Sequence, residues 1–388
     1  MTTLGLEEEY LLLEPETGLP AHRADEVEGL LEATPEVGRD EIQRELLSCQ
    51  IETATPVCDT LTQAEESLLN FRRKLAEAAA RTGILGAATG TSPWMRQAYP
   101  ELTDKPRYED LRASAPGIVG DQFVNGLHVH VGVPDPERGV QALNRIRPWI
   151  PLLTALSVNS PYWLGRDSGF GSWRVVHYRR WAVQGVAPWF ADAADYERRI
   201  TRLGASGAIL DRGVLTWVAR LSDHYPTLEL RACDVQLEAQ DSVLLGALTR
   251  ALVVTALHEA EADTAPLVPD PELLDAALWQ AARDGLTGSL VDFSTAEPVP
   301  ARGLLEDFLE HVGPALDAEG DTDWVRAGLA TIADRGTGAE RQRQAMRDGG
   351  SDALLDLYGR TPHPRAVDGV APARADEGRP RTARRGAR

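Results

Sequence analysis

Three consecutive glutamates interrupt an apolar stretch near the start of the chain, LGLEEEYLLL at residues 4–13. This alternation is typical of a β-strand, whose successive side chains point to opposite faces, so Glu7 and Glu9 share one face and Glu8 points to the other. Like charges about 7 Å apart on one strand face repel each other unless a positive charge lies nearby. The stretch therefore predicts a cation beside Glu7 and Glu9.

Three further stretches combine an apolar strand face with ionisable groups: QIETATP with an upstream glutamate, GLHVHVG and PTLELRACD. If these strands are neighbours in one sheet, several carboxylates and a pair of histidines gather on one concave surface. Mostly carboxylate ligands with one or two imidazoles favour Mg²⁺ or Mn²⁺ over Zn²⁺ or copper, and carboxylate-bound Mg²⁺ commonly faces substrate phosphates. The ionisable residues of these stretches are Glu45 and Glu52, His128 and His130, and Glu229 and Arg231.

Each stretch taken alone has a simpler interpretation. A run of glutamates can be a solvated strand edge, strand histidines can be ordinary surface or core residues, and Glu229 with Arg231 can take part in an ion pair. Glu45 can belong to a helix end. Four matching polar faces favour one shared site over four separate solvated strands. Such a site would need a metal ion, because like charges at short range otherwise raise one another's pKa.

Helical patterns separate these strands. TLTQAEESLLNFRRKLAEAAART (residues 60–82) predicts a helix with a threonine cap, apolar residues at helical spacing and Gly83 just past its end. Helices are also expected over residues 24–31 and 242–260 and in stretches up to Tyr358, and two prolines within QALNRIRPWIPLLTALSVNSPYW predict a broken helix. Residues 165–190 are expected to form loops near a site. Strands with one polar face each predict an α+β fold, an antiparallel sheet with helices packed on one side.

Composition limits the class of protein and its partners. The chain has 388 residues, 43% hydrophobic and 26% charged, which is the balance of a soluble globular protein. Its net charge of −19 argues against nucleic-acid or anionic-membrane partners. Three cysteines favour a reducing compartment, no secretory signal is visible, and no apolar stretch approaches the ~20 residues that span a bilayer. We expect a cytoplasmic protein without a P-loop or Rossmann motif, and the sequence leaves a homo-oligomer open.

The order of these stretches resembles that of the bacterial carboxylate–amine ligases known as type 2 glutamate–cysteine ligases. GLEEEYLLLEPETG is similar to the opening strand of that family, and the resemblance extends to about residue 358. It implies a glutamine synthetase-like catalytic domain over residues 1–359, with a curved antiparallel sheet that binds metal ions and nucleotide. Residues 360–388, arginine-rich and without apolar periodicity, are expected to be a disordered tail. The later blocks are QIETATPVCDTL, GTSPW, HVHVGVPDP, IPLLTALSVNSPYWLGRDSGFGSWR, YPTLELRACD and RGTGAERQR.

The resemblance also implies an activity and a set of site residues. The activity is ATP-dependent ligation of a carboxylate to an amine (EC 6.3 class), joining glutamate to cysteine or a related amine through an acyl phosphate, with ATP and Mg²⁺ or Mn²⁺ as cofactors. Arg174 and Arg231 would hold carboxylate groups of the amino-acid substrate, with His130 beside them. The implied metal ligands are Glu7, Glu9, Glu45, Glu52, His128 and Glu229, and the implied phosphate contacts are Arg220, Arg341 and Arg343.

Departures from the family pattern leave the substrates open. Val218 and Ala219 stand near a usually polar position, Leu221 replaces a usual proline, and Ser92 takes the place of a frequent histidine. One alternative is a metal-dependent hydrolase using the His-x-His strand, which would need parallel β/α units and more histidine ligands. Another is a non-catalytic sensor of nucleotide or amino acid. The retained glutamates count against a sensor, because a sheet that binds no metal would be more stable without them.

Overall fold

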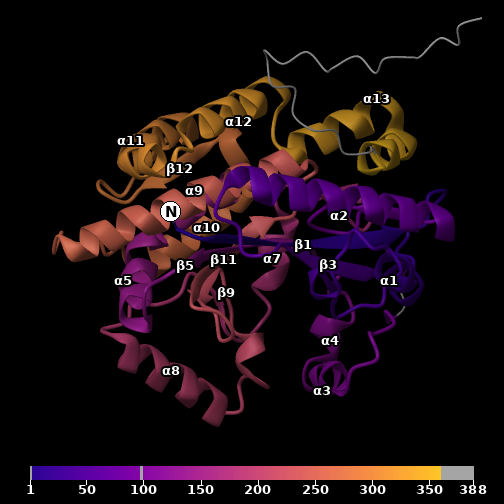
Figure 1. The fold of residues 1–388 in the computed structure, drawn as a ribbon, viewed down its shortest axis with the longest axis horizontal. Coiled ribbons are helices and arrows are strands. Elements are labelled where there is room, and N and C mark those ends of the chain that lie inside the picture. Colours follow the sequence, from indigo (N-terminus) through magenta and orange to yellow (C-terminus); the bar gives the residue numbers. More distant parts are fainter. Residues whose placement is uncertain (1, 97–98, 360–388) are drawn as a thin grey trace, which may run out of the picture.

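One open, seven-stranded antiparallel sheet organises the molecule (Figure 1). The computed structural model describes residues 2–96 and 99–359. β1 (Leu4–Leu13) pairs with β3 (Gln50–Ala54) and β5 (Gly126–Gly132), and β11 (Thr227–Asp234) pairs with β5. The four strands that carry the predicted ionisable groups are therefore direct neighbours. The sheet is completed by β2 (Ile42–Arg44), β4 (Leu85–Ala87) and β10 (Ala219–Leu221).

Helix α2 (Leu61–Thr82) forms where its local signals predict it. The Thr60 hydroxyl accepts a hydrogen bond from the backbone N–H of Gln63 at 3.3 Å, which satisfies one of the free donors of the first turn. Gly83 ends the helix with a left-handed φ of +70°, a conformation that glycine adopts without steric cost. The cap residues thus confirm both predicted ends.

Helix α9 (Ala239–Glu261) lies behind β1 and β5 and forms, with α2, the layer that covers one face of the sheet. By length and composition it is the one helix within residues 2–96 and 99–359 that could cross a membrane. The expectation that no apolar stretch approaches this length is therefore wrong. Since 72% of its apolar window is buried inside the fold, α9 is a core helix, and α11 (Ala301–Glu319) and α12 (Thr322–Arg335) pack on its outer side.

The predicted broken helix is present. α5 (Pro136–Ile146) runs into a 3₁₀ turn at Arg147–Trp149 and then into α6 (Ile150–Leu156). Pro148 and Pro151 cannot donate the backbone hydrogen bonds that would continue one helix through this point, which explains the interruption.

The sequence did not predict two short features. Residues 165–190 contain a short helix, α7 (Trp173–Tyr178). The helical stretch before Tyr358 is interrupted by a hairpin of β12 (Ser289–Asp292) and β13 (Glu297–Pro300). The remaining helices are α1 (Ala24–Glu32), α3 (Pro106–Ser114), α4 (Pro116–Val119), α8 (Ala193–Ala205), α10 (Pro271–Asp284), α13 (Gly338–Tyr358) and 3₁₀ turns at Arg39–Glu41, Arg212–Val214 and Gly285–Thr287; the remaining strands are β6 (Tyr162–Trp163), β7 (Arg166–Asp167), β8 (Gln184–Gly185) and β9 (Thr216–Trp217).

Short elements overlie the second face of the sheet. In Figure 1, α3, α4, α8 and β9 lie on the side opposite α2, α9 and α11–α13. This cover leaves the charged face enclosed, and Glu9 and Glu229 are each only 2% exposed. The predicted tail lies outside the described residues, and the domain division after residue 359 stays a prediction.

Candidate active site

The register of the sheet brings the predicted ionisable residues face to face. Because β1 lies between β3 and β5, its alternate residues are flanked on both sides by alternate residues of its neighbours. The same face continues across β5 to β11. Directly opposed across neighbouring strands are Glu7 and His128, Glu9 and Glu52, and Glu229 and His130.

The His128 imidazole lies among three carboxylates. Its Nδ1 is 3.0 Å from Oε2 of Glu7 and 3.8 Å from Oε1 of Glu229, and its Nε2 is 3.7 Å from Oε1 of Glu9. Nε2 of His130 lies 3.2 Å from Oε1 of Glu7, so both histidines of HVHV contact the first strand. The His-x-His and Glu-x-Glu pairs therefore form one cluster.

Two glutamates of this cluster have enough positive charge around them. Burial alone would raise the pKa of Glu7, but hydrogen bonds to His128 and His130 hold it far below its ordinary value. Burial also opposes ionisation of Glu229, yet the guanidinium groups of Arg231 and Arg220 hold its pKa well below the ordinary value. The surroundings of these two carboxylates favour their ionised forms.

Three other glutamates lack such compensation. Burial raises the pKa of Glu9, Glu45 and Glu52, and for Glu52 the charges of Glu7, Glu45 and Glu9 raise it further. A divalent cation would relieve this repulsion, because it stabilises the ionised forms of all three groups. Glu7 thus has His128 and His130 as partners, whereas the cation expected beside Glu9 stays a prediction.

The donor atoms fit a metal ion of the Mg²⁺ or Mn²⁺ type. Two sets of three side chains place one ligand atom each within 4.8 Å of the others, Glu7 with His128 and Glu229, and Glu9 with Glu52 and His128. The buried Nε2 of His128 makes no hydrogen bond within the described residues, so it remains free to act as a ligand. Carboxylate oxygens predominate in both sets, as hard divalent cations prefer.

Glu45 lies beside the cluster but belongs to neither of the two sets. It follows β2 directly, and its Oε2 accepts a hydrogen bond from the backbone N–H of Leu46 at 2.6 Å. Burial and then the charge of Glu45 raise the pKa of Tyr108 on α3. A ligand role for Glu45 stays a prediction.

Three of the predicted arginines lie at the cluster. Nε of Arg220 is 2.8 Å from Oε2 of Glu229, and Arg231 pairs with the other oxygen of the same carboxylate. Nη2 of Arg174, on α7, donates to the backbone carbonyl of Arg231 at 3.2 Å. Arg174, Arg231 and Val218 are among the residues that line a small cavity of about 20 Å³. One of the departures from the family pattern thus lies at the site.

Arg341 and Arg343, on α13, are not placed in the cluster. Nη2 of Arg341 donates to Glu238 at 2.7 Å, and Arg343 makes a two-pronged ion pair with Asp167 at 2.7 and 2.8 Å. Both side chains are thereby engaged with acidic partners on other elements. Their proposed role as phosphate contacts stays a prediction.

The sequence did not reveal the partner of Glu8. Its carboxylate is fully buried behind the sheet, where Arg72 of α2 donates to it from Nε at 2.9 Å and from Nη2 at 2.6 Å. Hydroxyl groups of Tyr10 and Ser242 donate to the same carboxylate. A usable signal existed, because Arg72 follows Phe71 within the apolar stripe of the predicted helix.

The fold is shared with solved ligases. It superimposes on the glutamate–cysteine ligase of Francisella tularensis in complex with AMP, with a TM-score of 0.64 at 13% identity, covering 92% of this chain and 87% of that one. A bifunctional glutathione synthetase from Pasteurella multocida gives a TM-score of 0.63 at 16% identity, covering 92% of this chain and 51% of that one. These matches establish the architecture. They show the fold, and the family is given by sequence comparison.

Sequence comparison gives the family. The family described as "Glutamate-cysteine ligase family 2(GCS2)" matches residues 3–357, and the chain belongs to it. "Putative glutamate--cysteine ligase 2-1" of Saccharopolyspora erythraea is 42% identical over 345 residues, 89% of this chain and 90% of the relative. "Putative glutamate--cysteine ligase 2-2" of Mycolicibacterium vanbaalenii is 42% identical over 347 residues, 89% and 93% of the two chains.

Family membership confirms the resemblance seen in the sequence and makes the chain an ATP-dependent ligase acting on small molecules. It supports a ligase over the non-catalytic sensor. The hydrolase alternative required a parallel β/α framework, whereas every pairing within the main sheet is antiparallel.

Proposed function

We propose that this cytoplasmic enzyme joins the carboxylate of glutamate to cysteine or a related small amine, using ATP and Mg²⁺ or Mn²⁺. The observation that carries the proposal is the acidic group Glu9, Glu45 and Glu52, whose pKa values are raised by burial even though Arg174 and Arg231 lie close enough to oppose the rise. The acidic group is suited to cations that accompany nucleotide phosphates, and the arginines to a substrate carboxylate.

The proposed metal ligands come from four neighbouring strands and the segment after β2. When bound, the metal ions neutralise the charge that develops on the β- and γ-phosphates. The chain itself contributes rigid placement, because five of the six proposed ligands are fixed by strand register. The proposed ligands are Glu7, Glu9, Glu45, Glu52, His128 and Glu229.

The arginines are proposed to bind the amino acid. Arg174 and Arg231 present guanidinium groups at one cavity, and a guanidinium can hold a carboxylate through two parallel hydrogen bonds. Arg220 shares the charge of Glu229 with Arg231, so Glu229 keeps a cationic partner when Arg231 contacts substrate. Although burial opposes it, Glu7 raises the pKa of His130, which favours a protonated imidazole beside the substrate.

In the proposed reaction a carboxylate oxygen of glutamate attacks the γ-phosphorus of ATP. The bond from that phosphorus to the β-γ bridging oxygen breaks, releasing ADP and leaving an acyl phosphate. The amine nitrogen then attacks the acyl carbon, phosphate leaves, and the nitrogen gives up a proton to solvent or a site carboxylate. Enclosure by α3, α4 and the segment around α7 limits the access of water that would hydrolyse the intermediate.

The test is ADP release by the purified protein with ATP and Mg²⁺ across a panel of carboxylates and amines. We expect turnover that requires glutamate and one amine and stops on addition of EDTA. Glu52→Gln should abolish turnover, whereas Glu297→Gln, which alters an exposed glutamate on β13, should not. Turnover that persists at full rate in Glu52→Gln, or that needs no carboxylate, would overturn the proposal.

A further inference from the structure

The last residue of β11, Asp234, lies on the charged face of the sheet because of an irregularity in the strand. Pairing with β5 shifts between Leu230 and Cys233, so β11 carries one extra residue there. Simple alternation would place Asp234 on the core face with Leu228 and Leu230. The bulge instead sets it opposite Gly126, on the same face as Glu229.

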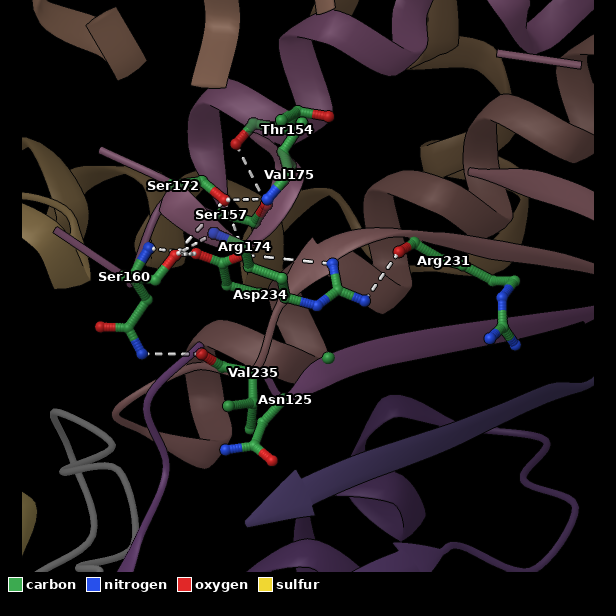
Figure 2. A network of polar contacts seen from close by, with 12 residues as sticks. Asn125, Thr154, Ser157, Ser160, Ser172, Arg174, Val175, Arg231, Asp234 and Val235 are labelled. Atoms are coloured by element: carbon green, nitrogen blue, oxygen red, sulfur yellow. Dashed lines mark hydrogen bonds and ion pairs between the residues drawn. The ribbon is translucent and has the colours of Figure 1, made fainter. Parts of the chain in front are cut away.

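Asp234 is fully buried and accepts hydrogen bonds from three donors (Figure 2). Its Oδ2 accepts from the backbone N–H of Asn159 at 2.9 Å and from the hydroxyl of Ser160 at 2.6 Å. Its Oδ1 accepts from the hydroxyl of Ser172 at 2.8 Å. Burial raises the pKa of Asp234, but Arg174 and these three donors favour its ionised form, in which each hydrogen bond is charge-assisted.

The two serines connect Asp234 to the first turn of α7. The Ser160 oxygen accepts the backbone N–H of Arg174 at 3.2 Å, and the Ser172 oxygen accepts that of Val175 at 3.3 Å. Each hydroxyl thus donates to the carboxylate and accepts from the helix. A helix of six residues is too short to be stable by itself, so these links fix where it begins.

Asp234 also lies close to the Arg174 side chain. Its Oδ1 is 4.0 Å from Nη1 of Arg174, and Nη2 of Arg174 donates to the carbonyl of Arg231. A Cβ at Gly126 would lie 2.3 Å from that Nη2, so the guanidinium fills the space that this glycine leaves. The buried Nε of Arg174 makes no hydrogen bond within the described part of the chain and remains available to a ligand.

We propose that Asp234 is a positioning residue for the amino-acid substrate, holding Arg174 in place through Ser160, Ser172 and its own charge. The assignment rests on the proposed function insofar as Arg174 binds the substrate carboxylate. Asp234 itself touches neither nucleotide nor amino acid in this scheme. Replacement of Asp234 should therefore change the binding of the carboxylate substrate and not that of the nucleotide.

The test compares Asp234→Asn with Asp321→Asn, in which another buried aspartate, 5% exposed against 0% for Asp234, loses its charge beside Arg250 of α9. Asparagine keeps the shape of Asp234 but replaces one acceptor oxygen with a donor, so one serine loses its partner. We expect the KM for glutamate to rise about 10- to 100-fold in Asp234→Asn, with the KM for ATP unchanged. Asp321→Asn should change neither constant.

A double variant separates positioning from general weakening. In an Arg174→Ala background, Asp234→Asn should add no further rise in the KM for glutamate, because its effect is exerted through Arg174. Ser172→Ala, which keeps the carboxylate, should raise the same constant by a smaller factor and serves if Asp234→Asn does not fold. Additive effects, or an equal rise in both KM values, would overturn the proposal.

A chemical readout makes the test independent of turnover. Phenylglyoxal modifies accessible guanidinium groups, and Arg174 is 3% exposed, so the wild-type peptide should stay unmodified in mass spectra. Modification should rise several-fold in Asp234→Asn and not in Asp321→Asn. If the wild type shows no glutamate-dependent turnover but this pattern holds, the proposed substrate is wrong and the positioning stands. Protection retained in Asp234→Asn refutes the positioning.

Discussion

Replacement of Arg72 by methionine should lower the free energy of unfolding strongly, although Arg72 lies behind the sheet and away from the charged face. Arg72 is the cationic partner of the fully buried Glu8 carboxylate, and its remaining donors bind the carbonyls of Leu237 and Gln236, each at 2.8 Å. Methionine preserves much of the apolar stem and removes all four hydrogen bonds. The carboxylate is then left buried with only hydroxyl donors.

Breaking one side of such a buried ion pair costs about 3–5 kcal/mol, because the remaining charge is uncompensated. We expect a loss of that size in the free energy of unfolding, measured by urea denaturation. Arg73→Met provides the matched control, since Arg73 is the adjacent, exposed residue of the same helix and should lose less than about 1 kcal/mol.

A double variant tests the reason for the loss. Glu8→Gln combined with Arg72→Met removes both charges, so it should be more stable than Arg72→Met alone. The buried pair does not stabilise this layer if the double variant loses as much free energy of unfolding as the two single variants together. The same holds if Arg72→Met loses no more than Arg73→Met.

Three further predictions concern the site and the fold. Burial, and then neighbouring charges, raise the pKa of Glu52 well above 4.5, so the folded state binds a proton that the unfolded chain has released. In EDTA the melting temperature should therefore fall as the pH rises above about 4.5, and Mg²⁺ or Glu52→Gln should reduce that fall. Gly126→Ala should raise the KM for glutamate by displacing Arg174, whereas Gly29→Ala, with open space around it, should not. Thr60→Ala should cost about 1 kcal/mol in urea denaturation and leave activity intact.

Elements with local signals could be predicted from the sequence. The ends of α2 follow from a threonine cap and a glycine, and the break between α5 and α6 follows from prolines that lack an N–H. The charged strand faces follow from period-two alternation, which depends only on strand geometry. These features required no knowledge of which segments pack together.

The features that escaped prediction depend on distant parts of the chain. The bulge that turns Asp234 toward Arg174 exists only in the pairing of β11 with β5, and α7 is held by bonds to residues outside it. The ion pair of Arg343 with Asp167, 176 residues earlier in the chain, was not predicted either, and the role of Arg343 as a phosphate contact stays a prediction. The helix α9 was predicted over residues 242–260, but its apolar length was underestimated because charged residues such as Arg250 interrupt its apolar sequence.

The glutamate run at the start of the chain also fixes the register of β1. A shift of one residue would turn Glu7 and Glu9 into the layer of α2 and α9 and move Glu8 to the charged face. Arg72 of α2 pairs with the carboxylate that faces this layer, so two carboxylates there would compete for it. The observed register gives Glu8 its cation and leaves Glu7 and Glu9 to the cluster. The pair behind the sheet therefore selects the alignment on which the metal ligands depend.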